Sequence, residues 1–256
     1  MKILLESLAI TLLFEFALFV LVFLTKRNDF ADVGWGLGFG VLAIHNFFQN
    51  PNPVFFQKIL FFLILAWSLR LAGHLGFRMI GKAEDQRYQE MQAGWKENLE
   101  LKSLFYIFFL QGFLLWILAI PLIFYLTSVN FVDTPLSWGA FALSLTGLIY
   151  ESIADSQKSI FKRKNHDTQS FIQSGLFKFS RYPQYFGEIT FWTGVALFPM
   201  TWGLNLFFLC APLILATLLL KVSGVPLLEK KYIKRKGYLD YALHTPLLFP
   251  NFFKSN

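Results

Sequence analysis

Seven apolar segments dominate the sequence and leave few folds open to it. Each is roughly 16 to 24 residues long, close to the ~20 residues that a helix needs to cross about 30 Å of hydrocarbon. The segments cover residues 3–24, 31–48, 59–77, 103–126, 136–153, 185–200 and 203–222. They lack the alternation of a membrane β-barrel, and an open sheet edge would leave backbone groups unsatisfied in lipid. The chain is therefore predicted to be all-α, a polytopic membrane bundle of about seven transmembrane helices.

Composition agrees with a membrane location and argues against two other classes of protein. The chain is 55% hydrophobic with a mean hydropathy of +0.49, more apolar than a soluble domain. A net charge of +7 could indicate nucleic-acid binding, but the basic residues are spread between the apolar segments, so no nucleic-acid partner is expected. The single cysteine, Cys210, excludes a disulfide framework.

The positions of Lys and Arg predict the orientation. Of 23 basic residues, 21 fall in the connections after the first, third and fifth segments, in the C-terminal tail or at the adjoining segment ends. The positive-inside rule then places the N-terminus outside and the C-terminus in the cytoplasm. We expect one domain, residues 1–256, whose cytoplasmic half is formed by loops 78–102 and 162–183 and the tail 223–256. The tail mixes basic and apolar residues as an interfacial helix would, which predicts contact with membrane lipid.

One face of the third segment is cationic and polar. Trp67, Arg70, His74 and Arg78 follow one another at spacings of three and four, so a helix places them on one side. Arginine offers a forked charged donor and histidine a titratable one, which together suit an anion or a phosphate. The alternative is that Arg70 and Arg78 only extend to the cytoplasmic interface.

The fifth and sixth segments carry further ionisable residues at membrane depth. Glu151, Asp155, Lys158 and Lys162 share one helical face. They form either an ion-pair ladder within the helix, or a carboxylate pair that binds ribose hydroxyls or orients a basic residue onto a phosphate. Glu188 adds another intramembrane acid, a residue that seldom faces lipid.

The glycine-rich run 34–40 resembles a nucleotide-binding loop only superficially. It does not fit G-x-G-x-x-G and follows no strand, whereas its overlapping G-x-x-x-G patterns favour close helix packing. Asp32, at the start of this helix, is interpreted as an N-cap, a site acid, or both. The four histidines show no metal-ligand spacing, so no metal site is expected.

Segment 174–188 reads SGLFKFSRYPQYFGE and resembles the G-L-[FW]-x-x-S-R-H-P-N-Y-x-G-E signature of steroid 5α-reductase-like membrane proteins, especially their bacterial branch. Other elements of that family have similar counterparts here. They lie at residues 32–36, 67–71, 84–88, 155–162 and 229–241. The resemblance thus spans nearly the whole chain.

The resemblance implies a membrane-embedded NADPH-dependent reductase of an activated C=C bond in a lipophilic substrate (steroid-, isoprenoid- or lipid-like), located in a bacterial inner membrane. Asp32 or His74 would supply the proton or polarise the substrate carbonyl, and Trp35 and Trp67 would wall the substrate. Residues carried over by matching position would bind the cofactor. They are Arg70, Arg78, Asp85, Arg87, Asp155, Lys162, Arg181, Gln184, Glu188, Trp192 and Tyr232.

Departures from the family pattern leave alternatives open. Trp67 stands where a tyrosine is expected, and Arg-Tyr-Pro-Gln replaces Arg-His-Pro-Asn, so steroid specificity does not follow. S-adenosylmethionine-dependent methyltransferases of the isoprenylcysteine carboxyl type have a similar R-H-P-x-Y segment, although their tandem Glu-Glu is Glu229-Lys230 here. A non-catalytic lipid-binding membrane protein is the third interpretation.

Overall fold

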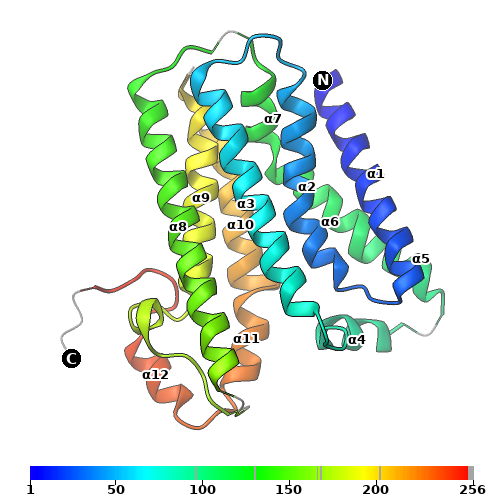
Figure 1. The fold of residues 1–256 in the computed structure, drawn as a ribbon, viewed down its shortest axis with the longest axis vertical. Helices are drawn as coiled ribbons and strands as arrows, with labels where there is room; N and C mark the ends of the chain where they lie inside the picture. The colour runs from blue at the N-terminus through cyan, green and yellow to red at the C-terminus, as the bar shows by residue number, and fades with distance from the viewer. Residues whose placement is uncertain (96, 130, 166, 168, 202, 253–256) are drawn as a thin grey trace. The chain divides into compact units, whose positions relative to one another are not determined.

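The computed structural model describes residues 1–95, 97–129, 131–165, 167, 169–201 and 203–252, and helices are the only regular elements in these ranges (Figure 1). The α-helices are α1 (Lys2–Thr25), α2 (Phe30–Phe47), α3 (Phe55–Met79), α4 (Gln86–Ala93), α5 (Leu99–Ser103), α6 (Leu110–Leu118), α7 (Ile120–Thr127), α8 (Pro135–Lys164), α9 (Pro183–Met200), α10 (Cys210–Thr217), α11 (Val225–Tyr232) and α12 (Tyr238–His244). Short π or 3-10 turns, η1 (Leu104–Phe109), η2 (Gly175–Lys178), η3 (Leu206–Leu209) and η4 (Leu218–Val222), extend or join them.

The predicted all-α fold is confirmed, and each of the seven apolar segments is helical. Among the residues that the structure describes, four helices are long and apolar enough to cross a membrane. They are Lys2–Thr25, Phe55–Met79, Leu99–Leu118 and Leu206–Tyr232. These helices identify a multi-pass integral membrane protein, while the number seven and the orientation stay predictions.

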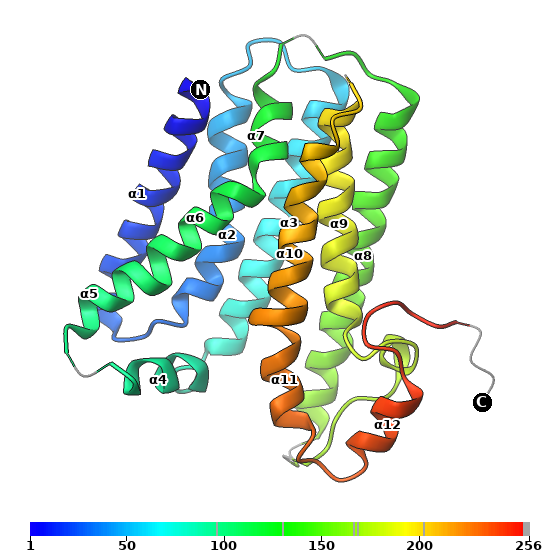
Figure 2. The same cartoon turned by 180° about the vertical axis from the view of Figure 1, so that it is seen from behind.

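The chain divides into two compact units. Unit 1 comprises Met1–Ser137 and Phe198–Leu204, and unit 2 comprises Trp138–Leu197 and Asn205–Asn256. In unit 1, α1, α2 and α6 lie against one another, and α2 packs along α3 (Figure 2). Each unit carries its own polar cluster.

Glycines on α2 allow its close contact with α3. A Cβ built on Gly36 would lie 3.0 Å from the backbone nitrogen of Ala72, and one on Gly40 would lie 2.5 Å from the hydroxyl of Ser68. That hydroxyl donates a 2.7 Å hydrogen bond to the carbonyl of Gly36. On the other side of α2, a Cβ at Gly34 or Gly38 would overlap leucine side chains of α1 and α6. The packing role predicted for this run is therefore confirmed.

Gly36→Val is expected to lower the free energy of unfolding by about 2 kcal/mol, because the branched side chain has no room against the α3 backbone. Titration with sodium dodecyl sulfate, followed by circular dichroism, measures this change. Gly76→Ala on α3 is the matched control, since a Cβ there meets nothing within 4 Å. An equal loss in both variants would show that helix packing is not the cause.

Unit 2 is built on an equally close pair, α8 and α9. A Cβ on Gly187 of α9 would lie 2.6 Å from the backbone nitrogen of Glu151 on α8, and one on Gly147 would lie 2.7 Å from the carbonyl of Gly187. The two backbones therefore touch at the level of Glu151. This contact fixes the start of α9, which carries the signature segment.

The C-terminal tail fixes the residues that precede α9. The backbone N–H of Arg181 donates to the carbonyl of Pro246 at 2.8 Å, and that of Asn251 donates to Phe179 at 3.0 Å. The Ser180 hydroxyl donates to Leu248 at 2.8 Å. Residues 246–251 thus lie along residues 179–182 and hold Arg181 in place.

Candidate functional site

The structure distributes the predicted site residues over both units. Unit 1 contains Asp32, Trp35, Trp67, Arg70, His74, Arg78, Asp85 and Arg87. Unit 2 contains Asp155, Lys162, Arg181, Gln184, Glu188, Trp192 and Tyr232. Sequence separation alone did not indicate this division.

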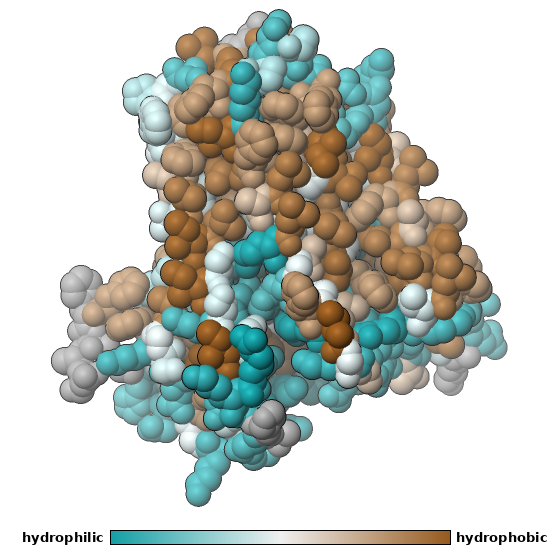
Figure 3. Space-filling view, in the orientation of Figure 1, coloured by the Kyte–Doolittle hydropathy of each residue, from teal (hydrophilic) through white to brown (hydrophobic). Residues whose placement is uncertain are grey.

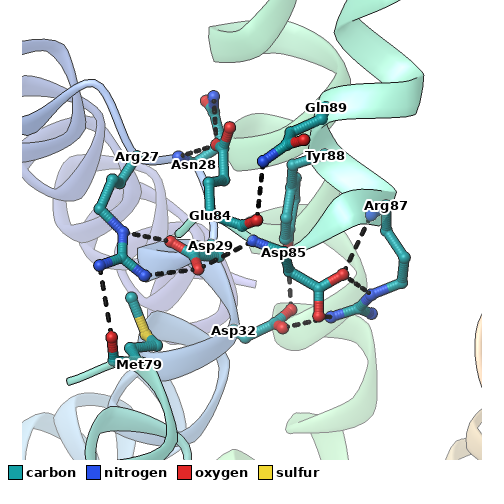
Figure 4. Close-up of polar contacts among 10 residues, drawn as sticks. All are labelled: Arg27, Asn28, Asp29, Asp32, Met79, Glu84, Asp85, Arg87, Tyr88 and Gln89. Carbon is teal, nitrogen blue, oxygen red and sulfur yellow. Dashed lines mark hydrogen bonds and ion pairs between the residues drawn. The ribbon is translucent and has the colours of Figure 1, made fainter. Parts of the chain in front are cut away.

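In unit 1, Asp32 is part of an ion-pair cluster at the start of α2 (Figure 4). One oxygen of Asp32 accepts from the Tyr88 hydroxyl at 2.7 Å, and the other pairs with Arg87 at 2.5 Å. Arg87 also pairs with Asp85 at 3.0 Å, and Asp85 caps α4 by accepting the backbone N–H of Arg87. Arg87 is therefore shared by two carboxylates.

The same cluster joins the loop before α2 to the loop before α4. Arg27 donates two hydrogen bonds to the buried Asp29, at 3.1 and 2.9 Å. Glu84 accepts from the backbone and the side chain of Asn28, at 2.6 and 3.1 Å. Asp29 also accepts the backbone N–H of Asp85 at 3.2 Å. Figure 4 shows these groups pointing toward one another from the two loops. Arg27, Asn28 and Asp29 were not predicted in this role, because no motif or helical spacing marks them.

The ion pair between Asp85 and Arg87 favours the charged forms of both groups. Burial alone would raise the pKa of Asp85, but hydrogen bonds from the side chain and backbone of Arg87 lower it overall. Burial lowers the pKa of Arg87, but Asp32 and Asp85 raise it above its ordinary value. Burial, followed by the charge of Asp32, raises the pKa of Tyr88 well above its ordinary value, so its hydroxyl stays a donor.

The two predicted substrate residues of unit 1 meet through a shared aromatic ring. Trp35 and Trp67 each contact Phe39 edge-on, with ring centroids 5.5 Å apart in both pairs. Asp32, Trp35 and Phe39 follow at spacings of three and four on α2, so the acid and the rings share a face. Arg70, His74 and Arg78 continue along α3 from the fully buried Trp67.

Unit 2 contains a cavity lined mainly by aromatic rings. Its empty volume is about 300 Å³, part of it open to solvent. The lining residues are Lys158, Phe171, Ile172, Phe177, Arg181, Tyr182, Tyr232, Tyr238 and Tyr241. Two cations, Lys158 and Arg181, therefore face a space surrounded by aromatic rings. Of the lining residues, Arg181 and Tyr232 were predicted as cofactor residues from the sequence.

Glu229 on α11 organises one wall of this cavity. A single oxygen, Oε1, accepts hydrogen bonds from Arg181 at 2.8 Å, from the Tyr182 hydroxyl at 2.7 Å and from the Tyr238 hydroxyl at 2.6 Å. Burial, with Glu229 adding to it, raises the pKa of Tyr238 to about 12, and the same causes raise the pKa of Tyr182 further. Both tyrosines thus stay protonated donors to the carboxylate at neutral pH.

Buried hydrogen-bonding atoms without partners lie at the start of α9. Gln184 is only 6% exposed, and neither its amide nitrogen nor its amide oxygen has a hydrogen-bond partner among the described residues. The Nε of Arg181, three residues earlier, lacks one as well within the same ranges. Such atoms are rare in folded proteins, because leaving one without a hydrogen bond costs about 1–3 kcal/mol.

Local contacts explain why this segment adopts its shape. Gly175 has a φ of 64°, a left-handed conformation that favours glycine. Beside it, the Gln157 side chain of α8 accepts the backbone N–H of Leu176 at 2.9 Å. The Tyr241 hydroxyl donates to the carbonyl of Phe177 at 2.6 Å. The 3-10 turn η2 is therefore held between α8 and α12, and it leads directly into Arg181.

The other predicted residues of unit 2 lie outside the lining of the cavity. Gln184, Glu188 and Trp192 follow at four-residue intervals on α9 and are all buried. Asp155 is half-buried and Lys162 is exposed on α8. Sequence reasoning missed Glu229, Tyr182, Tyr238 and Tyr241 as site residues. The recurrence of tyrosine around Glu229 in the tail was the available signal.

No group of three His, Cys, Asp or Glu residues that could hold a metal ion occurs in the part of the chain that the structure describes. His166, one of the four histidines considered from the sequence, lies outside the described residues.

Comparison with known proteins gives a family but no activity. The family model described as a protein of unknown function, DUF1295, matches residues 18–245 and so includes both polar clusters. No curated protein and no solved structure matches the chain. This chain is therefore an integral membrane protein that belongs to the DUF1295 family.

Proposed function

We propose that this protein is a membrane-embedded, NADPH-dependent reductase of an activated C=C bond in a lipophilic substrate, related to the steroid 5α-reductase-like proteins. The observation that carries the proposal is Arg181, which lines a cavity of rings and a second cation and whose buried Nε has no hydrogen-bond partner among the described residues. Three residues farther along, outside that lining, the buried Gln184 amide has no such partner either. The proposal includes seven spans, a cytoplasmic C-terminus and a bacterial inner membrane.

The residues of the cavity suit one end of a dinucleotide. Lys158 and Arg181 supply the cations that a phosphate requires, and Tyr232 and Phe171 supply ring faces for stacking. The Gln184 amide can donate and accept, as sugar hydroxyls and carboxamides require. The rest of the cofactor would extend beyond this cavity.

The residues of this chain would bind and orient the cofactor and would exclude water from the site. When bound, the nicotinamide supplies hydride. Arg181 would exchange part of its pairing with Glu229 for a phosphate oxygen, and the surrounding rings would exclude water from the ion pair. As a further part of the proposal, Asp32 or His74 polarises the substrate carbonyl or supplies the proton, with Trp35 and Trp67 against the substrate.

Calorimetry with NADPH and with S-adenosylmethionine, on full-length protein in detergent, tests the proposal. We expect NADPH to bind, and Arg181→Ala to weaken that binding by at least about tenfold, because the cation proposed to pair with a phosphate oxygen is lost. Arg163→Ala is the control. It removes an exposed cation from the last turn of α8 and is expected to leave NADPH binding unchanged. Binding of neither compound would overturn both enzyme proposals and leave the non-catalytic lipid-binding alternative.

A second candidate is favoured by one feature of the same cavity. Glu229 with Tyr182 and Tyr238 combines a carboxylate with aromatic rings, an arrangement that also suits a sulfonium cation such as that of S-adenosylmethionine. Binding of S-adenosylmethionine alone would therefore replace the reductase by a membrane methyltransferase of the isoprenylcysteine carboxyl type.

A further inference from the structure

We propose that the basic segment 230–236 and the exposed face of α12 form a docking surface for anionic lipid headgroups of the membrane that holds the protein. This lipid-docking surface comprises Lys230, Lys231, Lys234, Lys236, Leu239 and Leu243. The inference concerns the outer side of α12 and is independent of the proposed reductase activity.

The first argument is the distance of the segment from the hydrocarbon. The apolar helix Leu206–Tyr232 leads directly into it. A helix crosses about 30 Å of hydrocarbon in ~20 residues, which from Leu206 ends near Val225. Lys230 then lies about 8 Å farther along the axis, at the level of the headgroups. The segment is thus held beside the charged layer of the membrane by a covalent connection.

The second argument is the charge of the segment. Residues 230–236 contain five cations and no acid, and the four lysines are exposed. Arg235 is used internally, because it stacks on Tyr232 at 4.6 Å and donates to the carbonyl of Ser170. Four lysines therefore remain on the surface, and a cluster of this kind directly beside a transmembrane helix is typical of binding to anionic lipid.

The third argument is the distribution of residues on α12. Its inner face places Tyr238 and Tyr241 in the lining of the cavity. Its outer face exposes Leu239 by 58% and Leu243 by 83%, one helical turn apart. In Figure 3, hydrophilic residues gather at the end of unit 2 that carries α12, with hydrophobic residues among them. Exposed leucines beside lysines are the pattern of a helix that lies in a membrane interface.

A lipid surface explains the two features together better than a protein partner. The leucines need an apolar environment, the lysines need anions, and both lie next to the cytoplasmic end expected for a transmembrane helix. The inner tyrosines of α12 line the cavity, so the docked surface would support one cavity wall from outside.

Spin labelling tests the docking. The full-length Cys210→Ser, Leu243→Cys variant carries a nitroxide and is placed in nanodiscs of phosphatidylcholine or of an equimolar mixture of phosphatidylcholine and phosphatidylglycerol. We expect the label to be more accessible to oxygen than to a water-soluble nickel complex in the anionic discs, and the reverse in the neutral discs. Equal accessibility in both kinds of disc would overturn the proposal.

Charge variants make the test specific. Each lysine removed is expected to lower the ratio of docked to undocked label roughly fivefold, so Lys230→Gln with Lys231→Gln lowers it roughly 25-fold. Arg163→Gln with Lys164→Gln removes two exposed cations outside the surface and is expected to leave the ratio unchanged. An equal effect of the two pairs would contradict a specific surface. A label at Leu239→Cys, at the other exposed leucine of α12, repeats the measurement with Leu243 intact.

Discussion

Glu229→Ala is expected to lower the free energy of unfolding by about 3–5 kcal/mol. The substitution removes an oxygen that accepts from Arg181, Tyr182 and Tyr238 together, and it leaves the Arg181 charge mostly buried. Breaking a buried ion pair from one side has this cost because the remaining charge is uncompensated. Titration with sodium dodecyl sulfate, followed by circular dichroism, measures the loss.

Glu229→Gln is the matched control for the charge. Its amide oxygen still accepts hydrogen bonds, so we expect about half the loss of the alanine variant. Equal losses in the two variants would show that the charge of Glu229, and not only its position as an acceptor, holds the cluster together. No loss in either variant would contradict the central place of Glu229 in the cavity wall.

The glutamine variant also separates the two enzyme proposals by the sign of its effect on binding. Removing the negative charge beside Arg181 is expected to tighten NADPH binding about tenfold, or 1.4 kcal/mol, because the phosphate no longer competes with a carboxylate. The same change is expected to weaken the binding of S-adenosylmethionine, because its sulfonium would lose a counter-ion. Calorimetry with both compounds measures whether each one binds the variant more tightly or more weakly.

Gln184→Leu is expected to make the protein more stable and less able to bind. The amide is buried and has no partner among the described residues, so an apolar side chain of similar size is expected to raise the free energy of unfolding by about 1–2 kcal/mol. If the amide forms hydrogen bonds with NADPH, the same variant is expected to bind NADPH roughly 30-fold more weakly. Denaturant titration and calorimetry on one preparation measure both effects.

Gln157→Leu is the control for that trade-off. Gln157 is also a glutamine of unit 2, but its side-chain oxygen accepts the backbone N–H of Leu176 at 2.9 Å. Its replacement is therefore expected to destabilise the protein by about 1–2 kcal/mol. If Gln184→Leu destabilised the protein to the same extent, the amide would have a structural partner and the argument for a ligand would fail.

The sequence was most reliable for the helices, because hydropathy over about 20 residues is a property of neighbouring residues alone. It placed all seven helical segments, and it identified the glycine run 34–40 as a packing surface. The structure added what that run contacts: Gly36 and Gly40 face α3, whereas Gly34 and Gly38 face α1 and α6. Which neighbour a helix face meets depends on the positions of other helices, and spacing cannot supply that.

The candidate site was predicted in part. The signature segment led to Arg181 and Gln184, and the structure gives both an unusual environment. The partner of Arg181 was missed because Glu229 lies 48 residues away and is brought close only by the fold of α11. Asp32 and Arg87 were predicted separately, as a catalytic acid and a cofactor residue, and the structure joins them in one ion pair.

By itself the sequence determined the class of this protein: a helical, multi-pass membrane protein with cations next to its apolar segments. These properties follow from composition and periodicity, which do not depend on distant contacts. Only the tertiary structure decided which charges are compensated and which buried amide is left without a partner. Hydrogen bonds are short-ranged and directional, so pairing is settled only when distant segments have been brought together.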